Sequence, residues 1–176
     1  MIFGRFFPTE YYDSAYSIDY EALYNEGYRG VIYDIDNTLV PHGYPADEKA
    51  LALMERLKSI GYSITFLSNN KEQRVVMFNE KIGANYICKA GKPKPENYIK
   101  AAKQMECDVE KTLFVGDQIF TDIWGANNAG IKSVLVVPID KSTDEIQIVL
   151  KRILEKIVIK KYLKKHSMIT KRRGGN

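Results

Sequence analysis

The sequence has few cysteines and no long apolar run. Its 176 residues include two cysteines, Cys88 and Cys107, which are too few for a disulfide framework and lack the spacing of a metal site. No uncharged apolar stretch approaches the about eighteen residues that a membrane span needs. Residues 1–8 lack the basic region, apolar core and cleavage site of a signal peptide, so we expect a protein of the reducing cytosol.

Acidic residues are nearly absent from the C-terminal segment. Residues 151–176 hold ten Lys or Arg and one acid, Glu155, which gives a net charge of +9. Residues 1–150 hold sixteen Lys or Arg and twenty-one acids, which gives −5. A basic segment on an acidic body favours polyanionic partners, either nucleic acid or an anionic lipid surface.

The rest of the chain alternates between strand and helix patterns. The composition, 45% apolar and 27% charged, fits one globular domain with a substantial core. Short apolar runs predict strands at residues 31–33, 62–67, 86–88, 112–115 and 132–137. Apolar spacing and capping residues predict helices at residues 19–27, 46–60, 72–82, 95–105, 121–129 and 144 to about 165, with Asn70 as the expected cap of the third. This order predicts an α/β fold, a doubly wound Rossmann-like parallel sheet of about five strands with helices on both faces.

Two flanking segments each allow two interpretations. The aromatic extension over residues 1–28 includes Phe3, Phe6 and Phe7, which either cover the sheet or insert at a lipid interface. The helix from Asp144 carries an apolar stripe that we expect to pack on the sheet. That stripe consists of Ile146, Val149, Leu150, Ile153 and Ile157. We predict one domain over residues 1–165 and a basic, flexible tail over residues 166–176, which is the candidate contact for an anionic membrane.

Polar residues follow four successive predicted strands. The segments are Asp34-Ile35-Asp36-Asn37-Thr38, Ser68-Asn69-Asn70, Gly91-Lys92-Pro93-Lys94-Pro95, and Gly116-Asp117 with Asp122 a few residues later. Taken singly, each has a structural explanation: a turn, a helix cap, a solvated loop lysine, or an acid at a helix start. Because the carboxyl ends of parallel strands meet at one edge of a sheet, we expect the four segments to converge on one site.

Such a cluster suits phosphoryl transfer. Grouped acids repel one another and need a cation, and all-oxygen ligands favour Mg²⁺. We expect Asp34 to attack phosphorus and Asp36 to protonate the leaving oxygen, then to activate water. Lys92 offsets the charge of the phosphate. Thr38 and Ser68 position phosphoryl oxygens, and Asn69 is grouped with them as a phosphate-binding residue. Asp117 and Asp122 hold or support the metal.

These motifs resemble the haloacid dehalogenase (HAD) superfamily of phosphatases. The resemblance rests on Asp34-x-Asp36-x-Thr38, Ser68, Lys92 and Gly116-Asp117 followed by Asp122. It implies a metal held by Asp34, Asp117 and the backbone carbonyl of Asp36, and it places Lys92 on the phosphate, with Lys94 as the alternative. The segments between the motifs are too short for an inserted cap domain, so the site should be open to a large substrate.

The chain as a whole resembles a narrower group, the subclass IIIA phosphatidylglycerophosphate phosphatases. That likeness rests on residues 6–12, 30–40 and 68–70. It implies hydrolysis of phosphatidylglycerophosphate to phosphatidylglycerol. Three alternatives remain: a HAD phosphatase acting on a nucleic-acid end or a phosphoprotein, a phospho-acceptor receiver domain, and a catalytically inactive scaffold. The receiver domain fits poorly, because its acid pair follows the first strand and its acceptor aspartate follows a later one.

Overall fold

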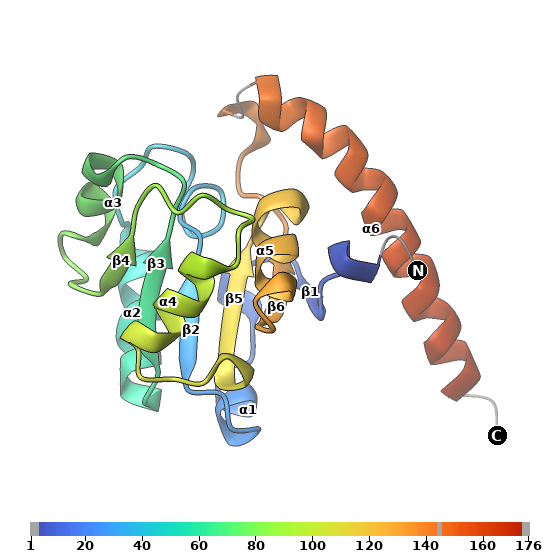
Figure 1. The fold of residues 1–176 in the computed structure, drawn as a ribbon, viewed down its shortest axis with the longest axis horizontal. Coiled ribbons are helices and arrows are strands. Elements are labelled where there is room, and N and C mark those ends of the chain that lie inside the picture. The colour runs from blue at the N-terminus through green and yellow to red at the C-terminus, as the bar shows by residue number, and fades with distance from the viewer. Residues whose placement is uncertain (1–3, 144–145, 174–176) are drawn as a thin grey trace.

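The computed structural model describes residues 4–143 and 146–173, which form a parallel sheet flanked by helices (Figure 1). The strands are β1 (Glu10–Tyr12), β2 (Gly30–Tyr33), β3 (Ser63–Leu67), β4 (Asn85–Ile87), β5 (Thr112–Gly116) and β6 (Lys132–Val136). They pair in the order β1-β6-β5-β2-β3-β4, and every pair is parallel. The predicted α/β class and parallel sheet are therefore confirmed, with six strands instead of about five.

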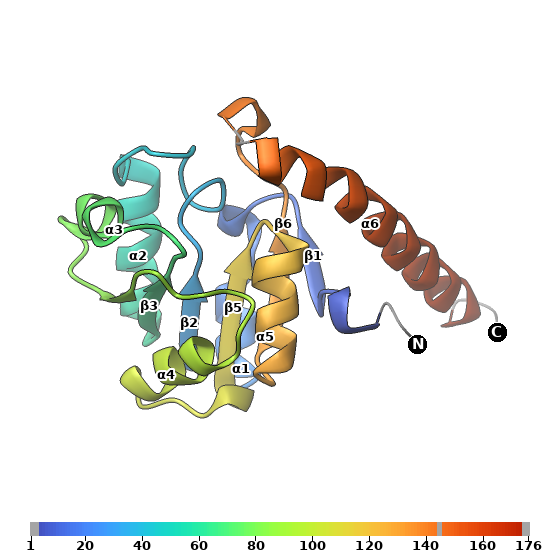
Figure 2. The same ribbon diagram turned by 45° about the horizontal axis from the view of Figure 1, so that its top comes forward.

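The helices cover both faces of the sheet. They are α1 (Tyr20–Asn25), α2 (Glu48–Ile60), α3 (Glu72–Asn79), α4 (Glu96–Gln104), α5 (Trp124–Asn128) and α6 (Ile146–Arg173), with short 3-10 turns η1 (Gly4–Phe6), η2 (Ala15–Ser17), η3 (Val109–Lys111) and η5 (Lys141–Thr143). Successive strand residues alternate between faces. Val31 and Tyr33 of β2 pack with α1, α2 and α3, whereas Ile32 packs with α4 and α5. Figure 2 shows the two layers on either side of the strands.

The sixth strand comes from the aromatic extension. β1 pairs with β6 at one edge of the sheet, with Tyr12 opposite Val136. Phe6 packs edge-on against Phe120 and Trp124 at 5.3 and 5.2 Å between ring centroids. Phe7 packs against Tyr162, whereas Phe3 lies outside the described residues. Of the two interpretations, sheet coverage holds for Phe6 and Phe7.

Local signals place most helix starts correctly. Asp19 accepts a hydrogen bond from the Ala22 N–H and Asp47 from the Ala50 N–H, as N-caps do. The predicted cap at Asn70 is wrong, because α3 is preceded by Lys71, which makes no side-chain capping bond. Asn70 binds Asp36 instead. The predicted helix over residues 121–129 begins as a π-helical turn, η4 (Ile119–Ile123), before α5.

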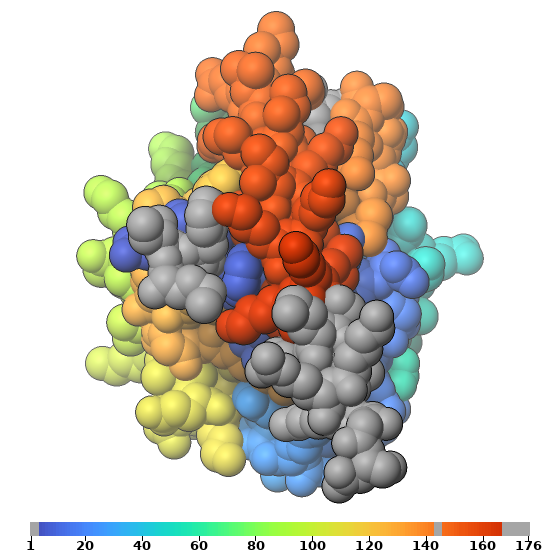
Figure 3. Space-filling view, turned by 90° about the vertical axis from the view of Figure 1, so that its right-hand side faces the viewer, coloured from blue at the N-terminus to red at the C-terminus, as the bar shows by residue number. Residues whose placement is uncertain are grey.

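The long C-terminal helix differs most from the prediction. Its predicted start at Asp144 lies outside the described residues, and the helix continues through the expected boundary at residue 165 to Arg173. The predicted stripe faces outward, with Ile146 81% and Leu150 61% exposed, while Glu155, Val158 and Tyr162 are buried. The reason is that apolar residues surround most of this helix, so spacing alone does not identify its inner face. Figure 3 shows α6 lying across one side of the molecule. Within the described ranges there is no helix of the length and apolarity that a bilayer crossing requires.

Candidate active site

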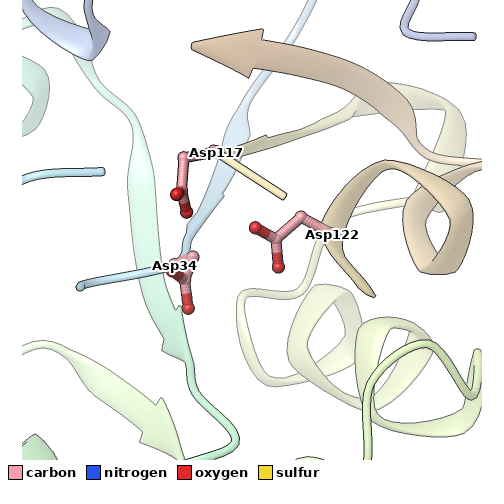
Figure 4. Close-up of side chains that lie close together, drawn as sticks. All are labelled: Asp34, Asp117 and Asp122. Carbon is pink, nitrogen blue, oxygen red and sulfur yellow. The ribbon is translucent and has the colours of Figure 1, made fainter. Parts of the chain in front are cut away.

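Three carboxylates lie together at the carboxyl ends of the sheet. Asp34 directly follows β2, Asp117 directly follows β5, and Asp122 lies in η4. One ligand atom from each of the three lies within 4.8 Å of those of the other two, and all three residues are buried. Figure 4 shows their carboxylates pointing toward a common centre. They meet because β2 and β5 are hydrogen-bonded neighbours whose ends lie side by side.

Gly116 makes the approach of Asp122 possible. A Cβ atom added at Gly116 would lie 2.5 Å from Asp122 Oδ2 and 2.6 Å from its Cγ, closer than any side chain tolerates. Asp122 Oδ2 also accepts a hydrogen bond from the Gln118 N–H at 3.0 Å. Asp122 therefore stabilises the start of its own helical turn, as the structural interpretation expects, while its other oxygen contacts Lys92. Its role at a metal stays a prediction.

Lys92 lies between two of the acids. Its Nζ is 2.7 Å from Asp34 Oδ1 and 2.7 Å from Asp122 Oδ1, and its side chain is 4% exposed. Burial lowers the pKa of Lys92, but Asp122 and Asp34 raise it by more, so the ammonium stays charged. Lys94, the alternative for this role, is exposed. The geometry thus places Lys92, and not Lys94, among the carboxylates.

The predicted phosphate-binding residues surround this group at different depths. Thr38 is buried, and its hydroxyl donates to Asp117 Oδ1 at 3.3 Å. The buried Ser68 Oγ accepts from the Asn70 N–H at 3.1 Å, and its own O–H can still donate. Asn69 is exposed, and its Oδ1 accepts from the Lys92 backbone N–H at 2.8 Å. Asn69 therefore fixes the loop that carries Lys92, and its contact with substrate stays a prediction.

Asp36 has partners of its own. Its carboxylate accepts hydrogen bonds from Asn70 Nδ2 at 2.6 Å, from Arg74 Nη2 at 2.8 Å and from the Gly43 N–H at 2.8 Å. These contacts join the loop after β2 to α3. The side chain of Asp36 is not part of the group of three, so its predicted acid–base role, and metal ligation through its backbone carbonyl, stay predictions.

The loop after β5 is also held from the C-terminal helix. Arg152 of α6 donates to the Asp117 carbonyl at 2.9 Å and pairs with Asp117 Oδ2. Glu155, 3% exposed, accepts from the Ile119 N–H at 2.7 Å. A helix more than thirty residues further along the chain thus fixes both the Asp117 carboxylate and the start of η4.

Comparison with known proteins identifies the family. The family model described as "HAD-hyrolase-like" matches residues 89–147. The chain is 37% identical over 138 residues to "Probable phosphatase YqeG" of Bacillus subtilis, an alignment that covers 78% of this chain and 80% of that protein. The chain belongs to the HAD superfamily of phosphatases.

Two further similarities are more distant. This HAD phosphatase is 27% identical over 169 residues to "Phosphatidylglycerophosphate phosphatase 1, chloroplastic/mitochondrial" of Arabidopsis thaliana, covering 87% of this chain and 49% of that protein. The chain thus spans about half the length of the plant protein. Among solved structures, NagD of E. coli superposes with a TM-score of 0.53 at 15% identity, over 65% of this chain and 90% of that chain. This likeness concerns the fold alone.

The charge balance of the HAD phosphatase site leaves room for a cation. Burial raises the pKa of Asp34 to about 7, against the opposing effect of Lys92 and with a further increase from Asp122. Burial likewise raises the pKa of Asp117 well above its usual range, although Arg152 opposes the shift. Three buried carboxylates thus face two cationic side chains. Asp34, Asp117 and Asp122 have the all-oxygen donor set that a hard divalent cation prefers, and they would hold such an ion.

Arg152, Glu155 and Arg74 are the residues that the sequence reasoning missed. Arg152 and Glu155 form an i, i+3 polar pair inside the mostly apolar segment 146–159, which is a usable sign that this face of α6 is buried. No comparable sign marks Arg74, because its pairing with Asp36 links positions 38 residues apart.

Proposed function

We propose that this HAD phosphatase is a Mg²⁺-dependent phosphomonoesterase that dephosphorylates phosphatidylglycerophosphate to phosphatidylglycerol through an aspartyl phosphate on Asp34. The observation that carries the proposal is the position of the Lys92 ammonium, 2.7 Å from the Asp34 carboxylate within the group of buried acids. A carboxylate approaching a phosphate dianion is repelled, and a fixed cation beside both lowers that repulsion.

The site residues carry out the successive steps of the reaction. An Asp34 oxygen bonds to phosphorus while the bond from phosphorus to the ester oxygen breaks, and Asp36 gives that oxygen its proton. Asp36 then takes a proton from the water that cleaves the acyl phosphate and releases inorganic phosphate. Thr38, Ser68 and Lys92 orient the phosphoryl oxygens. Asp34, Asp117 and Asp122 would hold Mg²⁺, which would supply positive charge against the phosphoryl group.

The short segments that follow β2 and β3 support a large substrate. The segment between β2 and β3 contains one helix, α2, and the segment between β3 and β4 contains one helix, α3. Neither holds a domain that would close over the ligand. The similarity to the plant phosphatidylglycerophosphate phosphatase favours a lipid head group over the other large substrates, a nucleic-acid end or a phosphoprotein.

Substrate choice is tested directly by phosphate release in the presence of Mg²⁺. Phosphatidylglycerophosphate in mixed micelles is compared with glycerol 3-phosphate and with 3′- and 5′-phosphorylated oligonucleotides. The proposal expects the highest kcat/KM on the lipid. A higher kcat/KM on an oligonucleotide would assign the enzyme to nucleic-acid ends instead.

Removal of the metal is expected to lower turnover by about a hundredfold or more, because the carboxylates then lack the charge that makes Asp34 approachable. The measurement is aryl phosphate hydrolysis after dialysis against a chelator, followed by readdition of Mg²⁺. Unchanged turnover in the chelated enzyme, with metal content checked by elemental analysis, would contradict the metal requirement.

The basic C-terminus is expected to contact an anionic membrane. Deleting residues 166–176 removes Lys171, Arg172 and Arg173, each worth about 1 kcal/mol near an anionic leaflet, so binding should weaken by about tenfold or more. Sedimentation with phosphatidylglycerol vesicles measures the effect, with neutral vesicles and RNA at matched salt as controls. Equal vesicle binding by the truncated and full-length chains would remove the tail from the proposal.

A further inference from the structure

A pocket of about 240 Å³ lies between α6 and the carboxyl end of β6. Figures 1 and 2 both place α6 on the side of the sheet formed by β1 and β6. Leu135 and Val137 line the pocket from the strand side, and Val149 and Ile153 line it from the helix. The two α6 residues are 45% and 54% exposed, so the pocket is an open groove with apolar walls.

The pocket borders the active site at Asp117. Asp117 belongs to its lining and also to the group of buried acids around Asp34. Arg152, which pairs with Asp117, forms part of the same wall. A molecule that extends from a phosphate at Asp34 past Asp117 would enter the pocket.

The shape of the pocket does not depend on apolar packing alone. Glu155 fixes α6 to the Ile119 N–H, and Arg152 fixes it to the Asp117 carbonyl, so two polar contacts hold the helix at a set distance from β6. Buried polar contacts of this kind specify one arrangement of the packed elements. The groove is thus a fixed part of the fold.

The chemistry of the lining indicates the ligand. Lys141 and Lys156 stand at the pocket beside its apolar walls, which suits a molecule with an anionic end and an aliphatic body. Whole-ligand pockets usually measure about 300–1,000 Å³, so this smaller volume fits one part of a ligand.

We propose that this pocket binds an aliphatic part of the substrate whose phosphate is held at Asp34. The pocket then favours phosphate esters that carry an aliphatic part, and it deepens the proposed function by placing that apolar part against α6. The proposal rests on the proposed phosphatase activity. It does not require a membrane, because a single dissolved molecule can fill the groove.

The test uses straight-chain alkyl phosphates from ethyl to octyl, kept below the concentrations at which they form micelles. For the unmodified enzyme, kcat/KM should rise about fourfold for each methylene that enters the pocket, the equivalent of about 0.8 kcal/mol. In Ile153→Asp and Val149→Asp this dependence on chain length should flatten. Leu154→Asp is the control, because Leu154 is an equally exposed apolar residue of α6 that does not line the pocket. In this variant the dependence on chain length should persist. Thermal unfolding of each variant checks the fold, and Ile153→Ser replaces any variant that does not fold.

A binding measurement separates the pocket from the catalysis. Calorimetry with octylphosphonate and ethylphosphonate, which are not hydrolysed, should show tighter binding of the longer chain by the unmodified enzyme and a smaller difference in Ile153→Asp. Tighter binding of the longer phosphonate, without hydrolysis of any ester, would support the pocket and refute the proposed function. Hydrolysis with no dependence on chain length, or with the same dependence in all variants, would overturn the pocket proposal alone. Neither binding nor hydrolysis would overturn both.

Discussion

Asp34→Asn should lower the hydrolysis of an aryl phosphate by about 10⁴-fold or more, because an amide cannot replace a carboxylate as the nucleophile. The substitution conserves shape, and the Asn oxygen can still accept the hydrogen bond from Lys92 Nζ. The measurement is phosphate release at saturating substrate with Mg²⁺ present. Activity that stays within roughly tenfold of the unmodified enzyme would refute Asp34 as the nucleophile.

The stability of this variant gives a second, independent result. Burial raises the pKa of Asp34, which means that the folded protein disfavours its charged form. Replacing the carboxylate with a neutral amide relieves that effect, so the thermal midpoint without divalent ion should stay equal or rise. Asp13→Asn, which changes an exposed acid far from the site in sequence, serves as the matched control for both measurements. A large loss of stability in Asp34→Asn alone would mean that the loss of activity reports unfolding.

The sequence predicts the core of the site because the topology is regular. Asp34, Lys92, Asp117 and Asp122 each come after a strand, and parallel strands bring the residues at their carboxyl ends to one edge of the sheet. The residue types at these strand ends are then enough to predict that the acids lie together. Nothing in that step requires knowledge of side-chain rotamers or of distant parts of the chain.

The parts that could not be predicted depend on long-range packing. β1 is three residues long and follows Pro8, so its strand character appears only when it pairs with β6. α6 has apolar residues on several sides between Ile146 and Ile159, and the face that turns inward is selected by Arg152 and Glu155 binding the loop after β5. The π-helical turn that carries Asp122 was not predicted either, because spacing alone predicts an ordinary helix there.

Lys92→Met should lower turnover by about a hundredfold to a thousandfold, which is the usual loss when one fixed charge-stabilising group is removed from an active site. Lys92 Nζ is the cation that contacts both Asp34 and Asp122, so the variant leaves two buried carboxylates facing each other. Methionine keeps most of the length of the side chain without its charge. The measurement is kcat with an aryl phosphate, made well below the thermal midpoint of the variant.

The same substitution should destabilise the protein by about 3–5 kcal/mol in the absence of metal, because removing one partner leaves the other buried charges uncompensated. Lys94→Met is the matched control: it makes the same chemical change two residues later, at an exposed position. Its free energy of unfolding should stay within about 0.5 kcal/mol of the unmodified protein. If Lys94→Met lost turnover and Lys92→Met kept it, the phosphate-binding lysine would be Lys94. Because the proposed reaction relies on the Lys92 ammonium beside the Asp34 carboxylate, that result would remove its central support.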